Sequence, residues 1–129
     1  MMKIPADLRY AESHEWVRVE DDGVVVGVTD FAQDEMGDIV FAELPTIGAE
    51  YEKGEGMAVI ESVKAVSDIY APIGGKVVAI NESLNDSPEL VNDDCYGEGW
   101  LVKLAPSNSE ELNTLLSAAE YGTQLESEA

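Results

Sequence analysis

Residues 54–75 read GEGMAVIESVKAVSDIYAPIGG, and this stretch decides the fold. Two apolar runs rich in β-branched residues, Met57 to Ile60 and Val66 to Tyr70, flank a short segment that contains Lys64. Short runs of this kind, bounded by glycine, proline and polar residues, are typical of β-strands. We therefore predict an antiparallel hairpin with Lys64 at its tip.

The turn of this hairpin is expected at residues 63–64. Mirror pairing then sets Ser62 opposite Ala65 and Glu61 opposite Val66. Two-residue turns that match the strand twist need positive φ and favour Asn-Gly or Asp-Gly, so the Val-Lys pair is a poor choice for folding. A turn sequence at an exposed tip that goes against the usual turn preference indicates a functional role for its residues. The alternative is a longer loop in which the lysine is merely solvated.

The charge balance is strongly acidic. The chain has 7 basic and 27 acidic residues, for a formal net charge of −20. This charge argues against nucleic acid or an anionic membrane surface as a partner, because both would repel the protein. It favours fast association with basic patches on other proteins, or it serves solubility alone. Lys64, a single basic residue flanked by Glu61 and Asp68, suggests an amine that is presented to another protein.

Length and composition predict one globular domain over residues 1–129, since the chain has 129 residues and an apolar fraction of 45%. We take a monomer as the default. No apolar stretch approaches the roughly 20 residues of a membrane span, and the first residues lack a secretory or import signal. We therefore expect a cytoplasmic or already processed protein.

The single cysteine, Cys95, excludes an internal disulfide and is expected to be a packed small residue.

Catalysis by this chain is not predicted. The chain contains one histidine, His14, so a metal cluster rich in histidine is excluded and no metal site is expected. Nucleophile-elbow, Walker and dinucleotide-binding patterns are absent from the sequence. The many carboxylates could pair for acid–base work, but most of them must be solvated in so acidic a chain.

Turn residues divide the chain into short elements. We predict a helix over residues 30–36, with Asp30 as its N-cap and Gly37 as its stop. Ser87 and Pro88 predict a helical turn, with the serine as cap and the proline in the first helical position. Besides the hairpin, the predicted strands cover residues 15–20, 24–28, 38–44, 75–80 and 100–104.

The character of the chain changes at Ser107. The pattern Ser107-Asn-Ser-Glu110 fits a capping box, and an apolar helical face follows, made of Leu112, Leu115, Leu116 and Ala119. We expect this C-terminal helix to pack its apolar face on the β core. Residues 122–129 form a polar tail that is expected to fray, so the core is predicted to span about residues 10–121.

The hairpin segment resembles the lysine attachment segment of the glycine cleavage system H proteins, through Glu61-Ser-Val-Lys64-Ala-Val-Ser-Asp68 and the following Tyr70-Ala-Pro-Ile-Gly74. The resemblance extends in one unbroken order over about residues 10–121. It includes SHEWV at 13–17, GVTD at 27–30, GDIVF at 37–41, ELP at 43–45, DSPELVN at 86–92 and YGEGW at 96–100. Such coverage makes the assignment specific, whereas a lysine in a hairpin alone would not.

The resemblance implies a mainly β barrel-sandwich hybrid of the lipoyl- and biotinyl-carrier type, with short helices and a C-terminal α-helix. It further implies lipoate in amide linkage to Lys64. Biotin carriers typically flank their lysine with methionines, whereas Val63 and Ala65 stand here, so biotin is not expected. The residues around the lysine that a lipoate-attaching enzyme is expected to recognise are Glu61, Ser62, Val63 and Ala65.

The implied function is that of a non-catalytic shuttle. Lipoate on Lys64 accepts the aminomethyl group from a pyridoxal-phosphate glycine dehydrogenase (decarboxylating), presents it to a tetrahydrofolate-dependent aminomethyltransferase, and is reoxidised by dihydrolipoamide dehydrogenase. Two alternatives stay open at this point. One is a relay that passes lipoyl groups on to other dehydrogenase complexes, and the other is a binding module whose lysine is never modified.

The resemblance also implies a surface groove in which the loaded arm rests. Ser13, Glu15 and Asp68 match the segments that border this groove in the family. We expect Glu15 and Asp68 to face the ammonium group of the cargo and Ser13 to donate or accept a hydrogen bond there. The alternative is that both carboxylates are ordinary solvated surface.

Overall fold

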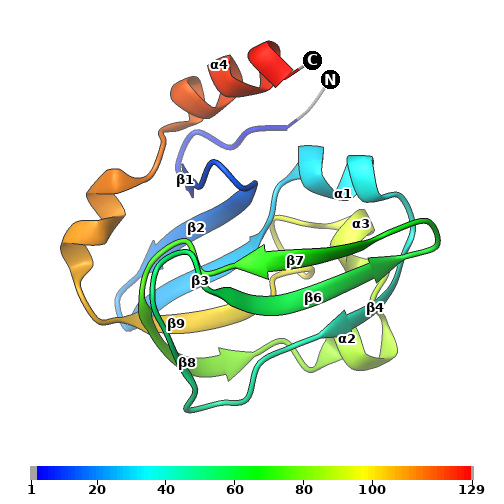
Figure 1. Cartoon of the computed structure of the whole chain (residues 1–129), viewed down its shortest axis with the longest axis horizontal. Helices are drawn as coiled ribbons and strands as arrows, with labels where there is room; N and C mark the ends of the chain where they lie inside the picture. The colour runs from blue at the N-terminus through cyan, green and yellow to red at the C-terminus, as the bar shows by residue number, and fades with distance from the viewer. Residues whose placement is uncertain (1–2, 129) are drawn as a thin grey trace.

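The structure, a computed structural model, describes residues 3–128 and contains two antiparallel sheets (Figure 1). One sheet has six strands in the order β1-β2-β3-β9-β8-β5, and the other has three in the order β4-β6-β7. The first sheet consists of β1 (Arg9–Tyr10), β2 (Glu15–Glu20), β3 (Gly23–Val28), β9 (Val102–Pro106), β8 (Gly75–Ile80) and β5 (Glu50–Tyr51). The second consists of β4 (Ile39–Glu43), β6 (Gly56–Ser62) and β7 (Val66–Tyr70).

One hydrophobic core lies between the two sheets. Strand β3 contributes a run of buried valines, and β6 and β7 contribute alternating side chains such as Ile60 and Ile69. Because alternate residues of a strand face opposite sides, the other face of the three-stranded sheet stays at the surface. Burial of the apolar faces holds the small sheet, and with it the lysine hairpin, against the larger sheet.

Helix α1 (Asp30–Met36) connects β3 to β4 and has the predicted bounds. Gly37 ends it with a φ of 79°, as expected of a glycine stop. The predicted cap is wrong, however, because Thr29 and not Asp30 is the N-cap. The Thr29 hydroxyl oxygen accepts the Ala32 amide at 3.3 Å, and the Asp30 carboxylate instead accepts the Lys3 amide and the Gln33 side chain.

Two short helices, α2 (Ser83–Asp86) and α3 (Leu90–Asp93), follow β8. The chain turns at Ser87 and Pro88 as predicted, with the Leu90 amide donating to the Ser87 carbonyl at 3.1 Å. The predicted serine cap is wrong, because α3 begins only at Leu90 and its N-cap, Glu89, makes no side-chain capping bond.

The C-terminal region differs from the prediction. A 3₁₀ helix, η1 (Ser109–Thr114), is capped by the Asn108 side chain, so the capping box predicted at Ser107 is wrong. Leu116 then pairs with Tyr10 in a β-bridge, which interrupts the expected continuous helix. Helix α4 (Ala118–Glu128) forms after this bridge. The segment over 122–128, which was expected to fray, is therefore helical.

A second, smaller core fixes α4 on the outer side of β1 and β2. Tyr10, Trp16 and Tyr121 are fully buried there, and the Tyr10 and Tyr121 rings stack with centroids 4.7 Å apart. Figure 1 shows α4 lying beside the N-terminal segment. The Trp16 Nε1 group donates to the Cys95 carbonyl at 2.9 Å, and Cys95 is a buried free thiol, as expected.

Candidate functional site

The hairpin of β6 and β7 has the predicted two-residue turn and register. The Ser62 amide donates to the Ala65 carbonyl at 2.8 Å, and Glu61 pairs with Val66. The Ser62 hydroxyl oxygen braces the turn by accepting the Lys64 and Ala65 amides at 3.3 and 3.0 Å. This side chain makes up for a turn sequence that lacks the usual Asn-Gly pair.

The tip carries Lys64 in an exposed position. In Figure 1 the turn between β6 and β7 extends beyond the strand ends, on the side of α1. Within residues 3–128, the ion pairs involve His14, Arg18 and Lys103 but not Lys64. The aliphatic stem of Lys64 passes over Gly37, where the Cβ of any larger residue would lie 3.4 Å from Lys64 Cε. The Lys64 stem therefore lies next to the C-terminal end of α1.

A cavity of about 160 Å³ lies between α1, β7 and the loop before β2. Its lining includes Met36, and the next residue in the chain, Gly37, is the one that the Lys64 stem passes. Half of the lining residues are apolar, and polar residues are contributed by the loop, by α1 and by β7. The lining residues are Ser13, His14, Val28, Phe31, Ala32, Glu35, Met36, Ser67, Asp68 and Ile69.

The cavity brings together two of the three predicted groove residues, Ser13 and Asp68, which are 55 positions apart in the sequence. Glu35 is a second carboxylate in the lining, beside Asp68, that sequence reasoning missed. Its signal was available, because Phe31 and Glu35 are four residues apart on the predicted helix and therefore share a face.

Glu15, the third predicted residue, does not line this cavity. Its side chain is 1% exposed and is hydrogen-bonded to Ser13, which does line the cavity. The Ser13 hydroxyl donates to Glu15 Oε1 at 2.5 Å, and the Tyr70 amide donates to Oε2 at 3.3 Å. Burial raises the pKa of the Glu15 carboxyl to about 7, although both hydrogen bonds act in the opposite direction.

The residues beside the lysine differ in exposure. Val63 is 71% exposed, Ala65 is exposed, Glu61 is half-buried and the Ser62 side chain is buried at the base of the turn. The tip therefore presents three kinds of group to a binding partner: the apolar Val63 side chain, the Lys64 amine and the Glu61 carboxylate.

Comparison with known proteins fits this arrangement. The sequence profile of the family described as "Glycine cleavage H-protein" matches residues 8–128. The chain belongs to this family. The glycine cleavage system H protein of a Psychrobacter species is 53% identical over 126 residues, which cover 97% of this chain and 100% of that protein. The probable glycine cleavage system H protein of Natronomonas pharaonis is 56% identical over 122 residues, covering 95% and 96% of the two chains.

The fold agrees as well. The crystal structure of a glycine cleavage system H protein from Mycobacterium marinum has 38% sequence identity and a TM-score of 0.88, covering 95% of this chain and 98% of that one. The predicted mainly β barrel-sandwich of the lipoyl-carrier type, with short helices and a C-terminal helix, is therefore confirmed.

The predicted function is confirmed at the level of the family. The H protein is the lipoyl-carrying shuttle of the glycine cleavage system, a carrier component that works with the system's other components. Neither the lipoyl relay nor the unmodified binding module is favoured by these matches. Within residues 3–128, no helix is both long and apolar enough to cross a membrane.

Proposed function

We propose that Lys64 carries the lipoyl group of this shuttle in amide linkage. The observation that carries the proposal is the exposed, unpaired amine at the tip of a braced two-residue turn. Acylation removes the positive charge of the amine, and no ion pair within residues 3–128 would be lost in the process.

The lining of the cavity suits this group. From bond lengths, a lipoyl-lysine arm reaches on the order of 14 Å beyond the backbone. The Lys64 stem passes Gly37, the neighbour in sequence of the lining residue Met36. Val28, Phe31 and Ile69 supply apolar surface for a hydrocarbon arm. A lipoyl group attached to Lys64 would supply a dithiolane able to carry the aminomethyl cargo between enzymes.

We propose that Ser13, Glu15 and Asp68 protect the cargo in this groove. A carboxylate beside an ammonium group raises the pKa of that amine and keeps it protonated, which prevents loss of the cargo. Asp68 is exposed and lines the cavity, so it is the direct partner. Glu15 acts from behind Ser13, through the hydrogen bond between their side chains. Since an exposed pair contributes only about 0–1 kcal/mol, protection requires that the arm be partly buried.

We further propose that a lipoate-attaching enzyme recognises Glu61, Ser62, Val63 and Ala65. Val63 and Ala65 are exposed on either side of the amine, and Glu61 adds a negative charge one strand position below the turn. The Ser62 hydroxyl acts indirectly, because its hydrogen bonds hold the tip in one conformation.

The whole chain, residues 1–129, is proposed to act as one monomeric, non-catalytic carrier domain in the cytoplasm. Its proposed partners are the pyridoxal-phosphate glycine dehydrogenase, the tetrahydrofolate-dependent aminomethyltransferase and dihydrolipoamide dehydrogenase. The net charge of −20 favours basic docking surfaces on these enzymes, and the tether keeps the arm at high effective concentration once one of them has docked.

Intact mass spectrometry tests the attachment site. Protein from lipoate-replete cells should be heavier than its sequence mass by one lipoyl amide, and Lys64→Arg should have the sequence mass. Lys76→Arg is the matched control, because Lys76 is exposed as Lys64 is but lies on strand β8 and not in the turn, so the variant should leave the modification in place. A persistent mass increase in Lys64→Arg, or none in the native protein, would refute the proposal.

A further inference from the structure

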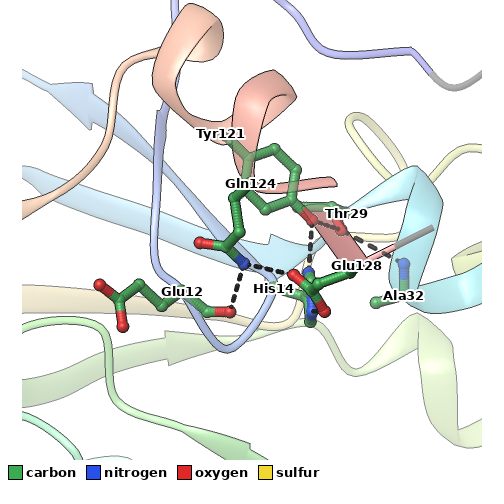
Figure 2. A network of polar contacts seen from close by, with 7 residues as sticks. All are labelled: Glu12, His14, Thr29, Ala32, Tyr121, Gln124 and Glu128. Carbon is green, nitrogen blue, oxygen red and sulfur yellow. Dashed lines mark hydrogen bonds and ion pairs between the residues drawn. The ribbon is translucent and has the colours of Figure 1, made fainter. Parts of the chain in front are cut away.

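Helix α4 is linked to the groove by one buried hydroxyl. The Tyr121 oxygen lies 2.7 Å from His14 Nδ1 and 2.7 Å from the Thr29 hydroxyl (Figure 2). Thr29 in turn caps α1 through the Ala32 amide. A single atom from the last helix therefore contacts both the loop before β2 and the start of α1, and both of these segments line the cavity.

His14 is the point at which this contact bears on the groove. It is the only non-glycine residue within 3–128 that has a positive φ, at 75°, and it stands between Ser13 and Glu15. A left-handed backbone costs a non-glycine residue roughly 1–2 kcal/mol, so surrounding contacts must hold it. The Thr29 amide donates to the His14 carbonyl at 3.1 Å, and Tyr121 holds the ring.

The contacts form a complete hydrogen-bond chain. His14 Nε2 lies 3.2 Å from Glu128, so with a proton on Nε2 the ring donates to Glu128 and Nδ1 accepts from the Tyr121 hydroxyl. The Thr29 hydroxyl then donates to the Tyr121 oxygen. The Gln124 side-chain amide bridges Glu128 and the Glu12 carbonyl at 2.8 and 2.9 Å, which ties the end of α4 to the same loop (Figure 2).

We propose that Tyr121 is a positioning residue of the cargo groove, whose hydroxyl fixes the left-handed His14 and the cap of α1. By holding His14, it sets the direction of Ser13 and of Glu15 behind it. By holding Thr29, it sets the helix that carries Phe31, Glu35 and Met36. This inference rests on the proposed function of the groove, and it makes the C-terminal helix part of the cargo protection.

The molecule provides a matched control for this hydroxyl. Tyr10 is equally buried and stacks on Tyr121 with the rings 5° from parallel, but its hydroxyl donates to the Pro5 carbonyl and to no groove residue. Tyr121→Phe and Tyr10→Phe thus each remove one hydrogen-bonded oxygen from the same stacked pair. A role in packing alone predicts similar effects of the two variants.

The first experiment uses the full-length, unmodified protein. Amide hydrogen exchange is measured at His14, Thr29 and Ala32 in the wild type and both variants, with thermal unfolding as a check of folding. Tyr121→Phe should speed exchange at these amides by about fivefold, the equivalent of one hydrogen bond, and Tyr10→Phe should leave them within about twofold of the wild type. Equal effects of the two variants would overturn the inference.

The second experiment uses loaded protein and measures release of formaldehyde as the cargo is lost. In this loss the carbon–nitrogen and carbon–sulfur bonds of the aminomethyl group both break, water supplies the oxygen of formaldehyde, and ammonium and the free thiol are the other products. Tyr121→Phe should speed the loss by about threefold to tenfold. Reoxidation of the free dithiol by dihydrolipoamide dehydrogenase should be unchanged, since an arm without cargo has no ammonium group for the groove to hold. Unchanged loss in Tyr121→Phe would also overturn the inference.

The two experiments separate the inference from the function on which it rests. If Lys64 never acquires a lipoyl group, the proposed attachment fails, and the exchange measurement still decides whether Tyr121 positions the groove residues. If loading succeeds and both variants behave like the wild type, the attachment stands and the positioning role is refuted.

Discussion

The Tyr70 amide donates to Glu15 Oε2 at 3.3 Å, across 55 residues of sequence. This bond joins the first residue of β2 to the last residue of β7, and hence the two sheets. Backbone and hydroxyl donors satisfy both oxygens of the carboxylate, yet its burial is so complete that the charged form is disfavoured. The Glu15 side chain therefore both connects the two sheets and titrates near neutral pH.

We predict that Glu15 lowers stability as the pH rises. The pKa of Glu15 is about 7 in the folded protein against an ordinary value of 4.5. Between these values the unfolded chain loses the proton while the folded chain keeps it, so stability falls across this window and levels off above about pH 7. The loss should reach up to about 3 kcal/mol. Urea unfolding at several pH values, in the wild type and in Glu15→Gln, measures it.

The difference between wild type and variant isolates Glu15 from the other carboxylates. The free energy of unfolding of Glu15→Gln should gain on that of the wild type from pH 4.5 to pH 7 and then run parallel to it. Glu12→Gln, which changes an exposed carboxylate in the same loop, should show no such gain. Parallel curves for Glu15→Gln over the whole range would contradict the raised pKa.

The hairpin, its register and helix α1 were predictable because local patterns specify them. Alternating apolar runs on either side of 63–64 leave one pairing that buries Ile60 and Ile69 together. The cap of α1 was missed by one residue, because threonine and aspartate are both good caps and stand side by side at 29–30. Tertiary contacts decide between them, since the Thr29 side chain is also fixed by Tyr121.

We predict that Thr29→Ala destabilises the protein more than Asp30→Ala. Thr29 is buried and loses both the cap and the bond to Tyr121, so the free energy of unfolding should fall by about 1–2 kcal/mol. Asp30 loses contacts with Lys3 and Gln33 nearer the surface, and about 0.5 kcal/mol is expected. Denaturant unfolding of the two variants gives the order, and the reverse order would restore Asp30 as the cap.

The C-terminal region and the burial of Glu15 were beyond local reasoning. The bridge between Leu116 and Tyr10 divides one apolar helical pattern into η1 and α4, and nothing near Leu116 in the sequence announces a partner about a hundred positions away. Likewise, a glutamate that begins a strand is usually solvated. Glu15 is buried because the folded chain brings the Tyr70 amide and the Ser13 hydroxyl against its carboxylate.

We predict that Ser62→Ala loosens the tip without disturbing the strands below it. The variant loses the acceptor of the Lys64 and Ala65 amides, so their hydrogen exchange should speed up and stability should fall by about 0.5–1.5 kcal/mol. Lipoate attachment at Lys64 should slow, because the amine is less well placed. Ser67→Ala on β7 is the control and should change neither the tip amides nor the attachment rate.

We predict that the two exposed carboxylates of the cavity, Asp68 and Glu35, each slow the loss of the aminomethyl cargo. Both lie at the surface, where an ion pair contributes about 0–1 kcal/mol, so Asp68→Asn and Glu35→Gln should each speed formaldehyde release by up to about fivefold. The effect should shrink in about 1 M salt, which screens exposed charges. Asp34→Asn is the control, since Asp34 neighbours Glu35 on α1 but does not line the cavity. If Asp34→Asn speeds the release as much as the other two variants, the effect comes from net charge and the carboxylates have no specific place in the groove.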